Sequence, residues 1–145
     1  MLDNRLMRFE AVHTTGIYCR AECSAKPHQK NVEPFPNAIA AEAAGFRPCL
    51  RCRPERLPDS IGRSGPPVIE QAVLLINEGF LDRHTEEALA TRVGYSARQL
   101  RRLFHQTVGA SPSFVARSRR AHFARRLLDE TDLSIEAIGL SLIHI

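Results

Sequence analysis

Four cysteines stand within the first 52 residues of this 145-residue chain, arranged as two close pairs. Three residues separate the members of the first pair, two separate the members of the second, and 25 lie between the pairs: Cys19, Cys23, Cys49 and Cys52. Two close pairs around a longer insert can close a tetrahedral metal site, and soft thiolates favour zinc over magnesium or calcium. Spacing alone favours a structural zinc site, with two disulfides or an iron–sulfur cluster as alternatives.

The N-terminal composition indicates that these thiols stay reduced. Residues 1–18 contain Asp3, Arg5, Arg8, Glu10 and His13, which does not fit a signal peptide, and the chain has no apolar run of 18 residues. We therefore expect a cytoplasmic protein with no membrane partner, in which cysteines serve metal binding or catalysis. Hydrophobic residues make up 43% of the chain and charged residues 25%, which suits one medium domain or two small ones.

The residues around the cysteines resemble the N-terminal domain of the Ada-type DNA repair regulators. The two matching stretches are TTGIYCRAEC (Thr14–Cys23) and NVEPFPNAIAAEAAGFRPCLRC (Asn31–Cys52). The resemblance implies that all four cysteines bind one Zn²⁺. It also implies that Cys19 accepts a methyl group from a methylphosphotriester in the DNA backbone, with Cys23, Cys49 and Cys52 as supporting ligands.

Zinc ligation makes this acceptor chemistry reasonable. A free thiol has a pKa of about 8.5 and is mostly protonated at neutral pH, whereas zinc deprotonates a coordinating thiol. Four thiolates around a divalent cation leave two net negative charges, and methylation of one sulfur leaves one. Because a negative charge near the DNA phosphates is removed, we expect methylation to strengthen DNA binding.

The resemblance also implies contacts to the DNA backbone near the cysteines. In the family, the threonine of the TTG motif and basic residues next to the cysteines touch the DNA. The corresponding residues are Thr15, Lys26, Arg47 and Arg51.

The chain divides at a stretch rich in Pro, Gly and Ser. We expect a zinc domain over residues 1–56, a linker over 57–67 and a helical domain over 68–145. In the first domain we expect short strands at Arg8–Val12 and Ile17–Tyr18. A helix over Ala38–Ala44, with Asn37 as its N-cap, completes a small α/β domain.

The second domain shows a succession of capped, amphipathic helices. The pattern predicts helices over 68–77, 86–92, 97–107, from 112 to about 128, and from 135 onward. Thr85, Ser96, Ser111 and Ser134 stand where N-caps are expected. The fold class is therefore α+β, a small α/β domain followed by an all-α region.

The stretch EEALATRVGYSARQLRRLF (Glu86–Phe104) resembles the first helix-turn-helix of AraC-type regulators. The resemblance implies that residues 97–107 are the recognition helix, which presents Arg98, Gln99 and Arg102 to the major groove. A generic helical hairpin is the alternative. We expect Tyr95, Leu103 and Phe104 to belong to the core rather than to stack on bases.

Arginine dominates the basic residues of the chain. Of the 20 basic residues 18 are arginine, nine of them lie from Arg92 to Arg126, and no acidic residue occurs between Glu87 and Asp129. Because a solvated helix surface usually mixes both signs, this pattern favours a surface that binds nucleic acid.

Residues 115–139 resemble the linking helix and the start of a second helix-turn-helix, in the form found ahead of an AlkA-type glycosylase. The chain then ends in LSLIHI (Leu140–Ile145), apolar residues where the family continues with a turn. We expect a fragment with a second helix-turn-helix that is incomplete, and two origins for the tail, residues 140–145, stay open: native or non-native.

The function that follows from both resemblances is DNA alkylation repair coupled to transcriptional activation. The implied partners are double-stranded DNA, through its methylated backbone and an operator, and RNA polymerase. One rival is a DNA-binding regulator with a purely structural zinc site and no methyl transfer. Another is a thiol-based metal or redox sensor, which would need labile zinc.

Overall fold

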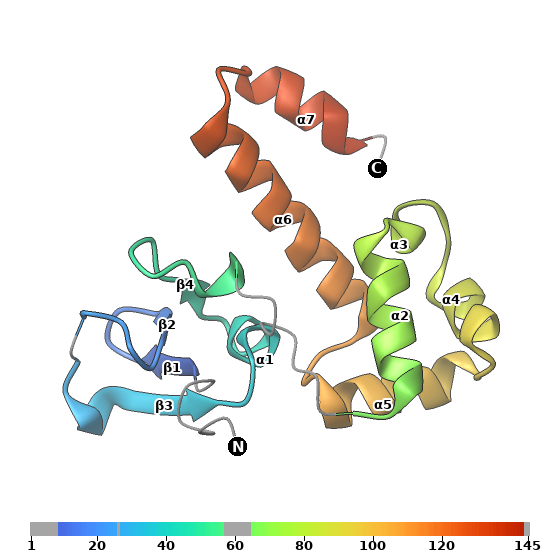
Figure 1. Cartoon of the computed structure of the whole chain (residues 1–145), viewed down its shortest axis with the longest axis horizontal. Helices are drawn as coiled ribbons and strands as arrows, with labels where there is room; N and C mark the ends of the chain where they lie inside the picture. Colours follow the sequence, from blue (N-terminus) through green and yellow to red (C-terminus); the bar gives the residue numbers. More distant parts are fainter. Residues whose placement is uncertain (1–8, 26, 57–64, 144–145) are drawn as a thin grey trace. The chain divides into compact units, whose positions relative to one another are not determined.

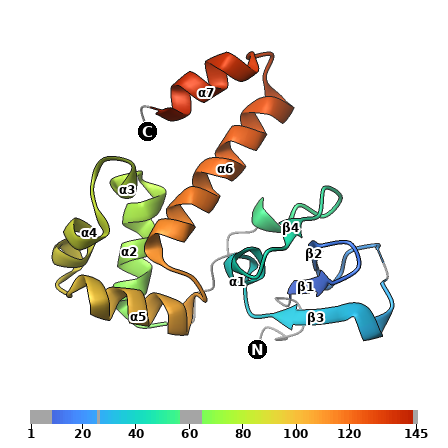
Figure 2. The same cartoon turned by 180° about the vertical axis from the view of Figure 1, so that it is seen from behind.

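The computed structural model describes residues 9–25, 27–56 and 65–143. These residues divide into two compact units. One comprises residues 9–56 together with Val108–Ala110, and the other comprises residues 65–107 and 111–143. Figures 1 and 2 show a small sheet with one helix in the first unit and a set of helices in the second. The α+β class expected from the sequence is confirmed.

The first unit is built on a four-stranded sheet of order β3-β1-β2-β4. Strands β1 (Phe9–Val12), β2 (Ile17–Arg20) and β3 (Val32–Phe35) are antiparallel, whereas the short β4 (Arg47–Pro48) runs parallel to β2. A tight turn joins β1 to β2, and Gly16 has a φ of 69° there, which a residue with a Cβ rarely adopts. Single 3₁₀ turns occur at Gln29–Asn31 and Pro54–Arg56.

Helix α1 (Ala38–Ala43) supplies the other half of the core of this unit. The Asn37 side chain accepts a hydrogen bond of 2.7 Å from the Ala40 N–H, so the expected N-cap is confirmed. Phe9 and Ala11 alternate along β1 and share one buried cluster with Tyr18 of β2 and Ala38 and Ala41 of α1. Because each fully buried large side chain contributes about 1.5–3 kcal/mol, this cluster fixes β2 against α1.

The second unit is all helical. Its helices are α2 (Pro67–Asn77), α3 (Phe80–Arg83), α4 (Glu86–Val93), α5 (Ala97–Thr107), α6 (Pro112–Glu130) and α7 (Ile135–Ile143). The hydroxyl groups of Thr85, Ser96, Ser111 and Ser134 accept from the backbone N–H three residues later, as expected for N-caps. The linker expected over 57–67 falls mainly outside the described residues, and its last residue, Pro67, begins α2.

Apolar residues spaced along α2, α4, α5 and α6 form the core of this unit. Leu89 of α4 and Leu100 and Phe104 of α5 are buried, which agrees with the predicted apolar face of the helix-turn-helix. Leu103 is half-buried. The prediction that Tyr95 belongs to the core is wrong, because 40% of this residue is exposed. In the described part of the chain, none of the helices combines the length and apolar character needed to cross a bilayer.

Candidate metal centre and nucleic-acid interface

The parallel pairing of β2 with β4 brings the two cysteine pairs together. Tyr18 is opposite Pro48 in this ladder, and the Cys49 N–H donates to the Tyr18 carbonyl at 2.9 Å. Cys19 directly follows Tyr18, and Cys49 directly follows Pro48, so the two cysteines are neighbours. A turn closed by the bond from the Cys23 N–H to the Arg20 carbonyl, 3.0 Å, folds the second cysteine back toward the first.

The four Sγ atoms of Cys19, Cys23, Cys49 and Cys52 all lie within 4.8 Å of one another. A tetrahedral site with Zn–S bonds of about 2.3 Å has sulfur–sulfur edges of about 3.8 Å, so the cluster is of the right size for one Zn²⁺. All four are free thiols in the described structure, and no histidine or carboxylate of the described residues joins the cluster. The donor set is that of one four-cysteine zinc site.

Backbone N–H groups point at two of the sulfurs. The Arg20 N–H lies 3.4 Å from Cys52 Sγ, and the Arg51 N–H lies 3.4 Å from Cys49 Sγ. Burial acts to raise the pKa of Cys49, but hydrogen bonds from the N–H groups of Cys52 and Arg51, together with those from the thiols of Cys19 and Cys52, outweigh it and lower that pKa to about 7. Such N–H···S bonds favour the thiolate form that a metal binds.

Burial and neighbouring thiols have the opposite effect on two other cysteines. Burial, with Cys49 close by, raises the pKa of Cys19 above its ordinary value, and burial raises the pKa of Cys52 to about 11. The protein alone therefore does not hold four thiolates together at neutral pH. A divalent cation supplies the charge that such a cluster needs, which is a further reason that zinc fits.

Sequence reasoning missed two features next to the cluster, the Tyr18–Glu42 hydrogen bond and the backbone conformation of Arg53. The Tyr18 hydroxyl donates to Glu42 Oε1 of α1 at 2.6 Å, although Tyr18 precedes Cys19 and its ring is fully buried. Arg53, directly after Cys52, has a φ of 47°, a left-handed conformation that costs free energy in a non-glycine residue. Arg20 Nε is buried without a hydrogen-bond partner among the described residues.

Three of the four residues predicted to touch the DNA backbone lie at the exposed surface of the first unit. Thr15 is in the β1–β2 turn, and the Arg47 N–H donates at 2.9 Å to the carbonyl of the adjacent Gly16, so these two residues are near each other. Arg51 lies between Cys49 and Cys52, at the metal centre itself. Lys26 falls outside the described residues.

The second unit contains the expected helix-turn-helix, formed by α4 and α5. Ala90 of α4 is buried, and Gly94 ends α4 with a φ of 84°. The three predicted reading residues, Arg98, Gln99 and Arg102, are all exposed on α5. Arg98 and Arg102 are one turn apart on the same face of the helix.

The arginine surface is less uniformly positive than the sequence indicated, because carboxylates from outside the arginine-rich segment neutralise part of it. Arg101 pairs with Glu86 at 2.6 Å, and Arg119 and Arg120 pair with Asp82 at 3.3 and 3.0 Å. Arg126 lies 3.6 Å from Glu130. These four arginines have roles within the fold, which a count of charges along the chain does not reveal.

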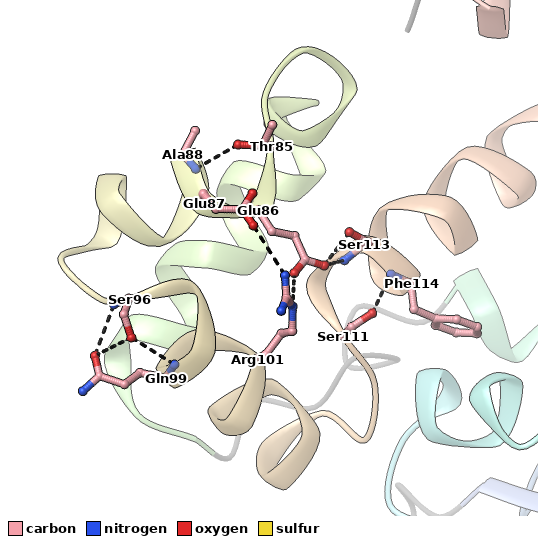
Figure 3. A network of polar contacts seen from close by, with 10 residues as sticks. All are labelled: Thr85, Glu86, Glu87, Ala88, Ser96, Gln99, Arg101, Ser111, Ser113 and Phe114. Carbon is pink, nitrogen blue, oxygen red and sulfur yellow. Dashed lines mark hydrogen bonds and ion pairs between the residues drawn. The ribbon is translucent and has the colours of Figure 1, made fainter.

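Glu86 is the centre of a network that joins three helices (Figure 3). It begins α4, and its side chain is only 10% exposed. Its carboxylate accepts from Arg101 Nε of α5 at 2.6 Å and from the Ser113 N–H of α6 at 2.9 Å, and it also accepts from the Ser113 hydroxyl. Burial opposes ionisation of Glu86, but Ser113 and Arg101 hold its pKa below the usual range.

Comparison with known families assigns both segments. The family described as the metal binding domain of Ada matches residues 6–55, a range that includes all four cysteines. A helix-turn-helix domain family matches residues 89–142, which include α5 and α6.

Two whole proteins are similar to most of this chain. A probable bifunctional transcriptional activator/DNA repair enzyme AlkA of Mycobacterium tuberculosis is 44% identical over 127 residues, which cover 85% of this chain and 25% of that protein. The bifunctional transcriptional activator/DNA repair enzyme AdaA of Bacillus subtilis is 33% identical over 135 residues, 91% of this chain and 61% of that protein. The chain thus spans only part of the length of these relatives.

A solved structure, the crystal structure of the methylated N-ADA/DNA complex, is 39% identical to this chain. The match covers 79% of this chain and 85% of that one, with a TM-score of 0.35.

Proposed function

We propose that this chain, which belongs to the Ada-type family through its metal-binding segment 6–55 and its helix-turn-helix segment 89–142, accepts methyl groups from damaged DNA and binds DNA as a transcription regulator. The observation that carries the proposal is the cluster of four free cysteines, with sulfurs within 4.8 Å, inside the Ada metal-binding segment. Its place of action would be the DNA in the bacterial cytoplasm. Activities that belong to the remaining length of its relatives are not assigned to it.

The proposed reaction is one displacement at carbon. The Cys19 sulfur attacks the methyl carbon of a neutral methylphosphotriester, and the new S–C bond forms as the C–O bond breaks. The electron pair leaves on the phosphate oxygen, so an ordinary phosphodiester is restored. When bound, zinc keeps the cysteine sulfurs deprotonated and therefore nucleophilic at neutral pH. Because the thioether is stable, each chain reacts once.

The residues around Cys19 suit a leaving group that gains negative charge. Arg20 has a buried Nε–H without a partner in the described structure, and Arg51 lies between two of the metal ligands. Arg20, Arg47 and Arg51 offer N–H donors to the phosphate oxygens. Thr15 offers a hydroxyl group. A methylated phosphate is neutral, so the anionic cysteine cluster can approach it without repulsion between like charges.

Regulation would follow from the change in charge. Loss of one negative charge at about 10 Å from a DNA phosphate is worth about 0.4 kcal/mol in bulk water and about 1.7 kcal/mol at an effective dielectric constant near 20. Methylation of Cys19 would thus tighten binding to an operator, where the bound protein recruits RNA polymerase. The RNA polymerase contact rests on the activator role of the relatives alone.

A second candidate is a DNA-binding regulator whose zinc site is purely structural. The observation that favours it is the burial of Cys19, the least exposed of the four ligands at 8%. Assignment of Cys19 as the acceptor therefore rests on its place in the TTGIYC motif, and DNA must gain access to its sulfur for the reaction to occur.

Stoichiometric transfer of a labelled methyl group separates the two candidates. Zinc-loaded protein is mixed with duplex DNA that carries methyl-labelled phosphotriesters, and the label on protein is counted after the DNA is digested. The proposal predicts uptake that saturates at one methyl group per chain and is abolished by Cys19→Ser. Folded, zinc-loaded protein that binds DNA but gains no label would establish the structural-zinc alternative.

A further inference from the structure

The polar side chains on the recognition helix are not equally available to a ligand. Helix α5 exposes four long polar residues in its first two turns, Arg98, Gln99, Arg101 and Arg102. Two of them, Gln99 and Arg101, are held by other parts of the same unit (Figure 3). What remains free on this helix determines which DNA bases it can recognise.

Gln99 caps its own helix through its side-chain oxygen. Gln99 Oε1 accepts from the Ser96 N–H at 3.2 Å and from the Ser96 hydroxyl at 3.1 Å, while Ser96 Oγ accepts from the Gln99 N–H at 3.2 Å. This is a reciprocal capping box, worth about 1 kcal/mol where its serine is replaced by alanine. Because the Ser96 backbone N–H can only donate, the Gln99 side-chain amide must turn its oxygen toward Ser96. The NH₂ group of Gln99 then points away from Ser96 (Figure 3).

Arg101 is turned toward α4. Its Nε lies 2.6 Å from Glu86 Oε2, and a terminal nitrogen lies 3.6 Å from Glu87 Oε1. Arg98 and Arg102, by contrast, form no ion pair or hydrogen bond with the described part of the chain. The groups left for a ligand on the first two turns of α5 are therefore two guanidinium groups and the amide N–H₂ of Gln99, all of them donors.

Glutamine recognises adenine by two bonds at once, because its oxygen accepts from N6 and its NH₂ donates to N7. In Gln99 the oxygen is already engaged. Guanine instead presents two acceptors, O6 and N7, in the major groove, which match guanidinium and amide donors. We infer that the first two turns of α5 present donors only and select sites with guanine, rather than adenine, at the bases they contact. This inference rests on the proposed DNA-binding function.

Selection from a random duplex pool with the full zinc-loaded chain tests the inference. Guanine is expected at the selected positions. Gln99→Glu keeps an oxygen for Ser96 but loses the NH₂ donor, so preference for guanine over adenine at one position should fall by about fivefold or more. Ser96→Ala removes the hydroxyl donor but keeps the backbone N–H that holds the Gln99 oxygen, so preference at the same position should stay with guanine, and circular dichroism checks that its helices remain folded.

Gln106→Glu is the matched control, since it makes the same chemical change at an exposed position in the last turn of α5. It should lower affinity through charge without changing base preference. Selection of an adenine that Gln99→Ala abolishes would overturn the inference while leaving DNA binding intact, as would binding with no base preference. Failure of the unaltered chain to bind any duplex would instead refute the proposed function on which the inference rests.

Discussion

The backbone N–H of Arg20, the residue after the candidate acceptor Cys19, lies 3.4 Å from the Sγ of Cys52. This contact links the end of β2 to the last of the four cysteines, 32 residues later in the chain. A second N–H···S bond, from Arg51 to Cys49, supports the other pair. The backbone of the first unit is thus arranged to stabilise sulfur in its deprotonated form, so metal binding and folding of this unit are coupled.

Removal of zinc should unfold the first unit and leave the second one folded. The apolar core of the first unit is small, and structural zinc contributes about 10–16 kcal/mol to the folding of zinc-finger peptides. With a strong chelator, amide resonances of the β1–β2 sheet should collapse while those of α4 and α5 persist, as measured by two-dimensional NMR. A sheet spectrum unchanged after complete metal removal would show that the cluster does not support the fold.

Replacement of Glu86 by Gln should destabilise the helical unit by about 1–3 kcal/mol. The variant loses a charge-assisted bond to Arg101 in a largely buried position and weakens the contacts to Ser113. Glu87→Gln is the control, because Glu87 is 68% exposed and 3.6 Å from Arg101, and should cost less than about 0.5 kcal/mol. Urea unfolding of both variants measures the difference, and equal effects would contradict the role assigned to Glu86.

The same carboxylate should make stability depend on pH. The pKa of Glu86 is lower in the folded protein than its ordinary value of 4.5, so its stabilising effect is complete above that value and is lost as pH falls through the lowered pKa. Unfolding of the helical unit should therefore become easier in acid below about pH 4.5, and less so in Glu86→Gln. Parallel pH profiles for the two proteins would rule out Glu86 as the titrating group.

Sequence patterns were sufficient for the elements whose signals are local. The N-caps Asn37, Thr85 and Ser96 are found where hydroxyl or amide residues precede an amphipathic run, because capping depends on a few neighbouring residues. Strand β3 was missed because Pro34 and Pro36 indicate a loop. The strand tolerates Pro34 because it lies at the sheet edge, which depends on the tertiary fold.

The sequence likewise predicted one part of the candidate site, the cysteine cluster, and not its long-range contacts. Cysteine spacing and the TTGIYC motif indicated the cluster, which the structure assembles. Other contacts join residues 24 to 38 positions apart, so no local sequence pattern predicts them. They are the bond from Tyr18 to Glu42 and the pairing of Asp82 with Arg119 and Arg120. For the same reason the neutralisation of Arg101 by Glu86 required the packing of α4 against α5.

Alanine substitution of Arg98 or Arg102 should weaken specific DNA binding by about 1–3 kcal/mol each, that is about 5- to 150-fold, because each removes a donor from the reading face of α5. Arg126→Ala is the control, since Arg126 is in α6 and is paired with Glu130. Binding titrations at fixed salt concentration measure the effect. Unchanged sequence preference in both α5 variants would exclude these residues from base recognition.

Methylation at the metal centre should raise affinity for the operator by about 2-fold to 17-fold for each nearby phosphate, which is the charge effect at about 10 Å converted to a ratio. The gain should shrink as salt concentration rises, because exposed charges are screened. Titrations of methylated and unmethylated protein at two salt concentrations measure it. Equal affinity of the two forms at low salt would show that methylation is not an electrostatic switch.

The central claim is that Cys19, rather than another ligand, receives the methyl group. Peptide mass spectrometry of zinc-loaded protein after incubation with methylphosphotriester DNA locates the modification directly. We expect one methyl group on the peptide that contains Cys19, with Cys23, Cys49 and Cys52 unmodified, and no gain in Cys19→Ser. A methyl group on any of the other three cysteines, or none on a folded, zinc-bound and DNA-bound chain, would contradict it.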